Sequence, residues 1–167
     1  MIRIAAFEKV SPEQFSQDWQ SAFGYEPRES VLANLRLPHR ATKGSAGYDF
    51  YLPCDITLPP GVGCLIPTGV RCRMEEGWVL QLFPRSGLGF KYRLQLDNTV
   101  GIIDSDYYAS DNEGHIMARL TNDSRSGKIL ELSRGTAFMQ GVFVSFGITF
   151  DDDVEASRNG GFGSTGI

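Results

Sequence analysis

Apolar side chains change their spacing once along this chain, and that change limits the folds open to it. Four of them recur at the spacing of a single helix face: Phe15, Trp19, Ala22 and Phe23. From Val31 onward the period is two, in short runs that are separated by turn residues. One short helix followed by many short strands predicts an all-β sandwich, jelly roll or barrel.

The predicted helix carries a signal at each end. Ser11 is a suitable N-cap, Pro12 takes the first helical position, and Gln14 lies three residues after the cap, as in a capping box. Gly24 supplies the stop. We expect the helix to pack on the body of the protein or on a neighbouring subunit.

The strand pattern is clearest in three runs, at residues 78–83, 129–132 and 138–144. Turn-forming residues separate the expected strands at residues 59–61, 67–69, 97–99 and 122–127. The length of 167 residues fits one domain, and no internal repeat is visible.

Composition excludes several classes of protein. The net charge of −4 argues against binding a nucleic-acid polymer or an anionic membrane. No apolar run approaches the roughly 20 residues that a membrane-spanning helix needs, and the N-terminus lacks the apolar core of a signal peptide. We therefore expect a soluble, cytoplasmic protein without a membrane partner.

The cysteines do not form a metal-binding pattern. Cys54, Cys64 and Cys72 include no CxxC pair, and His39 and His115 are the two histidines of the chain. We expect ordinary buried or half-buried thiols.

Three segments carry candidate chemistry. The run Pro84-Arg85-Ser86-Gly87-Leu88-Gly89 follows a strand and predicts a tight turn whose N–H groups and arginine can hold phosphate, although a purely structural turn uses the same residues. Asn98 lies at an expected hairpin turn. Asp104 follows two isoleucines, so it is either a partly desolvated general base or a solvated acid. Asp106 is expected on the same face, where it would either bind a metal ion or lie at the surface.

Five short segments occur in a characteristic order along the chain. They read AGYDF at 46–50, PRSGLGFK at 84–91, GIIDSDY at 101–107, GTAFMQ at 135–140 and RNGGFGSTG at 158–166. Together they resemble the five motifs of the trimeric dUTP diphosphatase (dUTPase) family, and the resemblance spans about residues 30 to 167.

The resemblance implies a jelly-roll or β-clip homotrimer that hydrolyses dUTP to dUMP and pyrophosphate, by attack of water on the α-phosphate. Such enzymes limit the incorporation of uracil into DNA and supply dUMP for thymidylate synthesis. It also implies a jelly-roll domain (30–150) and a mobile C-terminal arm (151–167) that closes the site of a neighbouring subunit. Outside the resemblance we expect an N-terminal strand and helix extension (1–29).

Site roles follow from the same resemblance, motif by motif. Asp104 would deprotonate the attacking water, and Tyr107 would pack on the deoxyribose. The residues that would bind the phosphates or their loop are Arg85, Ser86, Gly87 and Gln140. Those that would read the uracil edge are Asn98, Gly101, Ile102, Ile103 and the backbone of Met117. In the arm, Phe162 would stack on uracil, and the residues that would close over the phosphates are Arg158, Gly163 and Ser164.

The implied cofactor is Mg²⁺, held by substrate phosphates and water rather than by direct protein ligands. Asp49 would reach the ion through water or serve a structural role.

The chain departs from the family pattern at three places. Residues 108–113 intervene between Tyr107 and Gly114 as an insertion of about five residues. Ala137 stands where the family commonly has arginine, and Arg158 lies four rather than five residues before Phe162.

Two other functions remain open from the sequence. A dCTP deaminase has a similar phosphate turn, and Glu113 would then serve beside the pyrimidine amino group. A regulatory protein would keep the nucleotide pocket and act on a protein partner through the N-terminal helix and the insertion.

Overall fold

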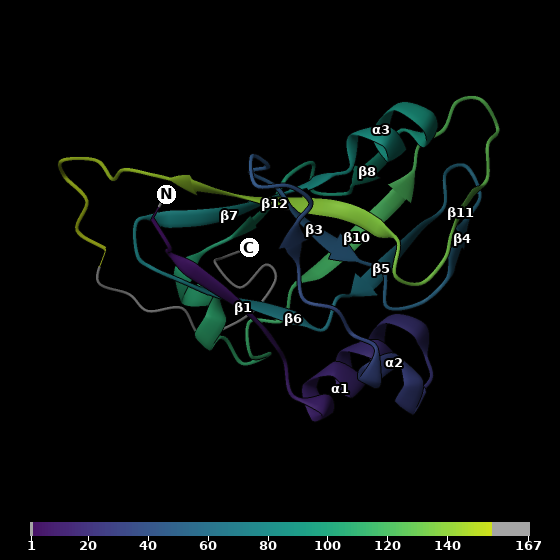
Figure 1. Cartoon of the computed structure of the whole chain (residues 1–167), viewed down its shortest axis with the longest axis horizontal. Coiled ribbons are helices and arrows are strands. Elements are labelled where there is room, and N and C mark those ends of the chain that lie inside the picture. The colour runs from purple at the N-terminus through teal and green to yellow at the C-terminus, as the bar shows by residue number, and fades with distance from the viewer. Residues whose placement is uncertain (1, 155–167) are drawn as a thin grey trace.

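A computed structural model describes residues 2–154 of the chain. Most of its elements are short strands (Figure 1). The strands are β1 (Ala5–Lys9), β2 (His39–Arg40), β3 (Tyr48–Tyr51), β4 (Ile56–Leu58), β5 (Gly63–Pro67), β6 (Val70–Met74), β7 (Trp78–Pro84), β8 (Leu94–Leu96), β9 (Gly101–Ile103), β10 (Met117–Asn122), β11 (Leu130–Leu132) and β12 (Ala137–Ser145). The helices are α1 (Pro12–Phe23), α2 (Glu29–Ala33), α3 (Ser86–Tyr92) and the 3₁₀ helix η1 (Ser105–Ala109).

The strands form two main sheets and two ribbons, and the pairs within them are antiparallel. The larger sheet has the order β2-β3-β12-β7-β9, and the smaller has the order β5-β10-β8. The ribbons pair β1 with β6 and β11 with β4. This arrangement confirms the predicted all-β fold of the jelly-roll type.

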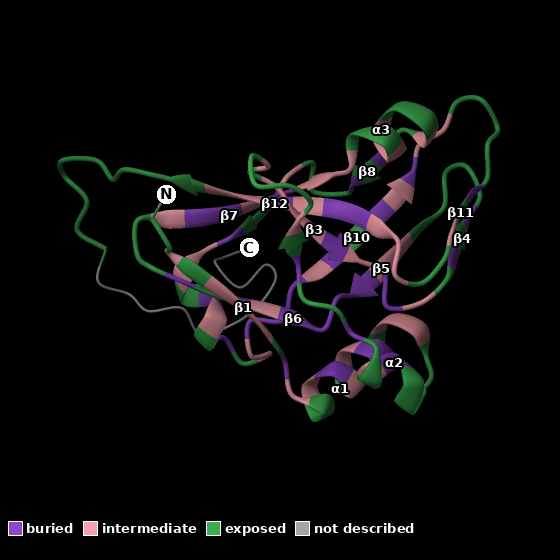
Figure 2. Ribbon diagram, in the orientation of Figure 1, coloured by how far each residue is buried: buried purple, intermediate pink, exposed green. Residues whose placement is uncertain are grey.

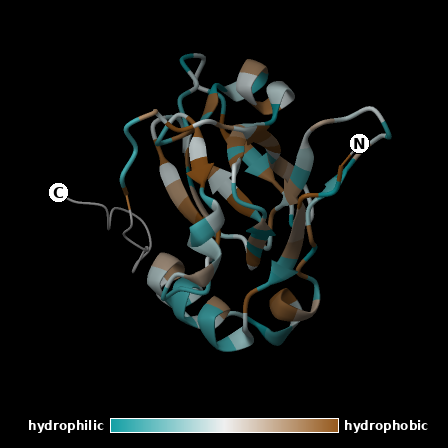
Figure 3. Ribbon diagram, turned by 90° about the vertical axis from the view of Figure 1, so that its left-hand side faces the viewer, coloured by the Kyte–Doolittle hydropathy of each residue, from teal (hydrophilic) through white to brown (hydrophobic). Residues whose placement is uncertain are grey.

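Apolar residues of both sheets meet in one core. Leu80 and Phe138 are fully buried on β7 and β12, and Leu120 is fully buried on β10. Buried positions run along the middle of β7, β12 and β5 in Figure 2, while many of the outer loops are exposed. Figure 3 shows a similar division by hydropathy, with much of the brown on the inner strands and teal mainly on the outer loops and helices. The alternating sequence pattern therefore places one face of each sheet inside.

Helix α1 packs on the body of its own chain, beside β5 and with α2 (Figure 1). Phe15 and Trp19 are buried and form a second apolar cluster with Val31 of α2. Gly24 ends the helix in a left-handed conformation (φ +79°), and its N–H donates to the carbonyl of Gln20. The predicted helix and its stop are confirmed.

The capping box of α1 differs from the prediction in one half. The hydroxyl of Ser11 accepts a hydrogen bond from the N–H of Gln14, as expected. The side chain of Gln14, however, donates to Asp18 instead of turning back to the cap. Glu113, from the insertion, accepts the N–H of Ser11 in its place.

Three further helices were not expected from the sequence. Residues 86–92 form α3, so the predicted tight turn after β7 is the first turn of a helix. The five-residue elements α2 and η1 are too short for a helical period to be visible in the sequence. Within residues 2–154, none of the helices has the length and hydropathy that a membrane-spanning segment requires.

Candidate active site

A first group of predicted residues meets where β3, β12 and β7 lie side by side. Asp49 on β3 lies opposite Gln140 on β12 in the strand register. Arg85, directly after β7, forms an ion pair with Asp49, with 2.6 Å between Nη1 and Oδ2. The Asp49 side chain is mostly buried and that of Arg85 is partly exposed, so the guanidinium is oriented while part of it still faces solvent.

The start of α3 presents backbone donors beside this group. The carbonyl of Arg85 accepts the N–H groups of Leu88 and Gly89, so the N–H groups of Ser86 and Gly87 precede the first helical hydrogen bonds. A Cβ added at Gly87 or Gly89 would meet open space in the chain. Glycine destabilises a helix interior by about 1 kcal/mol relative to alanine, and nothing within the described chain requires it here. A helix start that contains glycines which the fold itself does not require is typical of a backbone that a ligand approaches closely.

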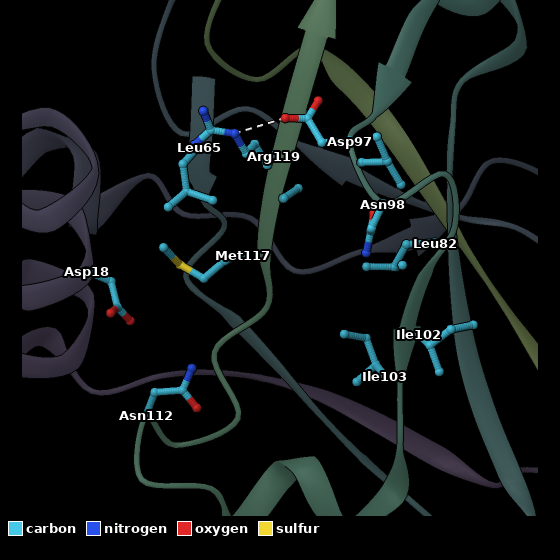
Figure 4. A pocket seen from close by; sticks show the side chains of 13 residues that line it. Asp18, Leu65, Leu82, Asp97, Asn98, Ile102, Ile103, Asn112, Met117 and Arg119 are labelled. Carbon is cyan, nitrogen blue, oxygen red and sulfur yellow. Dashed lines mark hydrogen bonds and ion pairs between the residues drawn. The ribbon is translucent and has the colours of Figure 1, made fainter. Parts of the chain in front are cut away.

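A second group of predicted residues lines a cavity of about 560 Å³. Asn98 enters it from the turn between β8 and β9, and Met117 enters it from the start of β10 (Figure 4). The three residues of β9 line it as well: Gly101, Ile102 and Ile103. Every residue that the resemblance assigned to the uracil edge therefore contributes to one pocket.

The turn that carries Asn98 is not part of a paired hairpin. Strand β8 pairs with β10 of the smaller sheet, and β9 pairs with β7 of the larger sheet. The predicted hairpin is therefore wrong, because the chain changes sheet at this turn. At the neighbouring position, Asp97 is held by Arg119 at 2.9 Å (Figure 4). It also accepts a hydrogen bond from the hydroxyl of Thr121.

Asp104 and Tyr107 lie just beyond β9. Asp104 is half-buried and precedes the first residue of η1. Tyr107 is 5% exposed, and its hydroxyl donates to the carbonyl of His115 at 2.8 Å. Neither residue is among those that line the cavity in the described part of the chain.

The two groups remain separate within one chain. Of the described residues around the cavity, none belongs to the phosphate group of Arg85, Ser86, Gly87 and Gln140. The predicted arm residues, Arg158, Phe162, Gly163 and Ser164, lie outside the residues that the structure describes.

Sequence reasoning missed four polar residues of the cavity, namely Asp18, Asp97, Asn112 and Arg119. Asp18 of α1 and Asn112 of the insertion line it on the side away from Asn98 (Figure 4). Burial opposes ionisation of Asp18, but hydrogen bonds from His115 and Gln14 together hold its pKa below the ordinary value. The i, i+4 spacing of Gln14 and Asp18 was a local signal for the hydrogen bond between them. No local pattern, however, could place Asp18 or Asn112 at this pocket.

Thiol chemistry has no support at this site. All three cysteines are free, with Cys72 buried and the others half-buried, as predicted. Burial raises the pKa of Cys54 and Cys64 to about 11 and that of Cys72 to about 12. These thiols stay protonated at neutral pH and are poor nucleophiles.

Comparison with known proteins identifies the family. The family model described as dUTPase matches residues 33–166. The chain belongs to the dUTPase family. Deoxyuridine 5'-triphosphate nucleotidohydrolases from Lactococcus lactis and Hahella chejuensis are 40% and 41% identical to it, over 80% and 79% of this chain and 90% and 88% of theirs.

Solved structures of dUTPases have the same fold. The crystal structure of dUTPase from Streptococcus mutans has a TM-score of 0.64 and 35% identity, and covers 86% of this chain and 98% of that one. A mutant dUTPase of Staphylococcus bacteriophage 80alpha, solved with dUpNHpp, has a TM-score of 0.65 and 20% identity. It covers 95% of this chain and 100% of its own.

Proposed function

We propose that this chain hydrolyses dUTP to dUMP and pyrophosphate, with water attacking the α-phosphate. The observation that carries the proposal is the cavity, because the residues assigned to uracil recognition line one pocket although they come from three separate segments. The dUTPase family match and the nucleotidohydrolase relatives support the same reaction.

Uracil would enter between Asn98 and β9. The backbone of Gly101 to Ile103 offers the donors and acceptors of an edge strand, and the apolar walls of Leu82 and Leu96 limit the space around the ring. A pocket without room for a 5-methyl group rejects thymine by steric clash, which discriminates more strongly than the loss of a contact.

Asp104 would act as the general base. Its position directly after β9 supports this role, since it connects the base-binding strand to the residue that would pack on the sugar, Tyr107. The carboxylate would take a proton from the attacking water as the bond from the α-phosphorus to pyrophosphate breaks. Such assistance contributes about 10²- to 10⁴-fold in rate.

The triphosphate would lie at the start of α3. Arg85 supplies positive charge, Ser86 and Gly87 supply N–H donors, and Gln140 supports the loop from β12. The open space beside Gly87 and Gly89 supports a close approach of phosphate to the backbone.

We further propose that the working enzyme is a homotrimer whose active sites are shared between subunits. The separation of the phosphate group from the base cavity within one chain supports sites that are completed by another copy. A row of exposed apolar residues at the end of β12 and just after it supports this further: Val144, Phe146, Ile148 and Phe150. This segment leads away from the body (Figure 1), and a neighbouring copy would cover the row.

The arm is the third contributor in this proposal. Residues 151–167 would extend from the jelly-roll domain of 30–150, so that Phe162 stacks on the uracil of a neighbour. Arg158, Gly163 and Ser164 would then contact its phosphates.

We also propose that the reaction uses Mg²⁺, held by substrate phosphates and water. The described residues include no group of three or more His, Cys, Asp or Glu side chains that could hold a metal ion, and Mg²⁺ commonly binds through phosphates with few carboxylates. Asp49 fits a contact through water, because Arg85 already holds its Oδ2 beside the phosphate loop. When bound, the ion would neutralise phosphate charge.

In the cell, the reaction would limit uracil in DNA and supply dUMP. We place the protein in the cytoplasm as part of the same proposal. Its three free cysteines support this location, since reduced thiols are usual there.

A substrate panel tests the proposed function. Purified protein is given dUTP, dTTP, dCTP or UTP, with and without Mg²⁺, and both pyrophosphate and ammonia are measured. We expect Mg²⁺-dependent pyrophosphate from dUTP, little from the other nucleotides, and no ammonia. Binding of dUTP without formation of dUMP would contradict the proposal.

Ammonia from dCTP would instead identify a deaminase. The position of Glu113 argues against that reaction, because both of its carboxylate oxygens accept hydrogen bonds from Ser11. Glu113 is also not among the described residues that line the cavity.

A further inference from the structure

The insertion reaches the phenol of Tyr107 through one side chain. Asn112 Nδ2 donates to the Tyr107 hydroxyl at 2.8 Å, and the hydroxyl donates its own proton to the carbonyl of His115 at 2.8 Å. The hydroxyl thus has a donor and an acceptor that together fix its position. Asn112 also lines the cavity, so this contact lies beside the bound nucleotide of the proposed function.

His115 is itself held in one orientation. It is completely buried, and its Nε2 accepts the N–H of Gly69 at 2.8 Å. The proton therefore lies on Nδ1, which donates to Asp18 Oδ2 at 2.5 Å. The carbonyl that receives the Tyr107 hydroxyl is consequently part of a rigid unit tied to helix α1.

The insertion ends at Gly114, where the family pattern resumes. Gly114 has a positive φ of +68°, and a Cβ there would lie 2.7 Å from the carbonyl oxygen of Tyr107. Its N–H donates to Asn112 Oδ1 at 3.2 Å, which orients the amide of Asn112 toward Tyr107.

The outer part of the insertion is attached to the N-terminal segment. The hydroxyl of Tyr108 donates to Glu8 at 2.7 Å, and the guanidinium of Arg71 lies 3.6 Å from the centre of the Tyr108 ring. Together with the contact between Glu113 and Ser11, these bonds hold the insertion against the body on both sides of Asn112.

We infer that Asn112 is a positioning residue that sets selectivity for the sugar. The inference rests on the proposed function, in which the ring of Tyr107 packs on the deoxyribose and leaves no room for a 2′-hydroxyl. A ring held by both Asn112 and His115 cannot tilt away from that hydroxyl. Because Asn112 belongs to the insertion, the ring of Tyr107 is held in this chain by a residue from outside the five motifs.

Replacement of the amide tests this role. Asn112→Leu keeps a similar volume and removes the donor, and Asn112→Ala serves as a second variant should leucine prevent folding. The measurement is the ratio of kcat/KM for dUTP to kcat/KM for UTP. We expect the ratio to fall about tenfold, the effect of losing one partly buried hydrogen bond. For dUTP, KM should rise while kcat stays within about twofold of the wild-type value. For UTP, kcat/KM should increase.

Tyr107→Phe separates an action through the phenol from a general loss of structure. It removes both hydroxyl bonds and keeps the ring, so we expect a similar fall in the ratio. The double variant Asn112→Leu/Tyr107→Phe should be no worse than Tyr107→Phe alone. Asp111→Ala, an exposed neighbour in the same insertion, should leave the ratio unchanged.

An unchanged ratio in a folded Asn112 variant would overturn the inference, as would fully additive effects in the double variant. Failure of the wild-type protein to hydrolyse dUTP would instead refute the proposed function, and the two failures are therefore distinct.

Discussion

Glu113 completes the cap of helix α1 by binding Ser11, which lies 102 residues earlier in the chain. Its Oε2 accepts the N–H of Ser11 at 2.8 Å, and its Oε1 accepts the Ser11 hydroxyl at 2.6 Å. The insertion and the N-terminal helix, two segments outside the five motifs, are thus one structural unit.

Removal of this cap should destabilise the protein. Glu113→Ala leaves the N–H of Ser11 without its acceptor, and loss of a cap costs about 0.5–2 kcal/mol. We expect a decrease of about 1 kcal/mol in the free energy of unfolding at pH 7, measured by urea denaturation. Glu26→Ala, at an exposed glutamate, should change it by less than about 0.5 kcal/mol.

The same contact should depend on pH. Hydrogen bonds from Ser11 lower the pKa of Glu113 below 4.5, so the folded state favours the carboxylate. The stabilisation is complete above that ordinary value and is lost as the pH falls through the lower folded value. The difference between the wild type and Glu113→Ala should therefore shrink below pH 4.5, and a constant difference down to pH 3 would contradict this contribution.

Asp104→Asn should separate binding from turnover. The amide keeps the shape of the carboxyl group but cannot accept a proton from water, so kcat should fall about 10²- to 10⁴-fold. Affinity for a non-hydrolysable dUTP analogue, measured by calorimetry, should change by less than about threefold. Asp111→Asn serves as the control, and unchanged kcat in Asp104→Asn would remove Asp104 from the base role.

Asp49→Ala should weaken substrate binding through Arg85. Without the carboxylate at 2.6 Å, the guanidinium loses its fixed orientation. We expect KM for dUTP to rise about tenfold, which corresponds to about 1.4 kcal/mol. Asp123→Ala breaks a more exposed ion pair with Arg93 and should leave KM unchanged. Equal effects of the two variants would refute a special role for the pair of Asp49 and Arg85.

Deletion of residues 156–167 should abolish most activity and leave the oligomer intact. The arm supplies ring stacking and phosphate contacts in our proposal, whereas the jelly-roll body holds the copies together. Light scattering should give the same mass per particle, corrected for the missing residues. A monomeric product would show that these residues hold the assembly instead.

Local features of the fold were accessible from the sequence. Ser11, Pro12 and Gly24 predicted both ends of α1, and alternating apolar runs predicted β7 and β12. Such features depend on neighbours within a few residues, so their signals are complete in a short segment.

Long-range contacts were not accessible in the same way. The partner of the Ser11 N–H is Glu113, and Gln14, the local candidate, binds Asp18 instead. Residues 86–92 formed a helix although Gly87 and Gly89 favoured a turn, because helix propensity is weak beside tertiary context. The cavity residues Asp18 and Asn112 likewise depend on how α1 and the insertion pack, which no spacing rule encodes.

Hydrolysis of dUTP in H₂¹⁸O, followed by mass analysis of both products, shows which phosphorus atom the water attacks. Attack on the α-phosphorus places the new oxygen on dUMP, so we predict one ¹⁸O in each dUMP and none in pyrophosphate. Label in pyrophosphate, or the absence of dUMP, would rule out attack of water on the α-phosphorus by this protein.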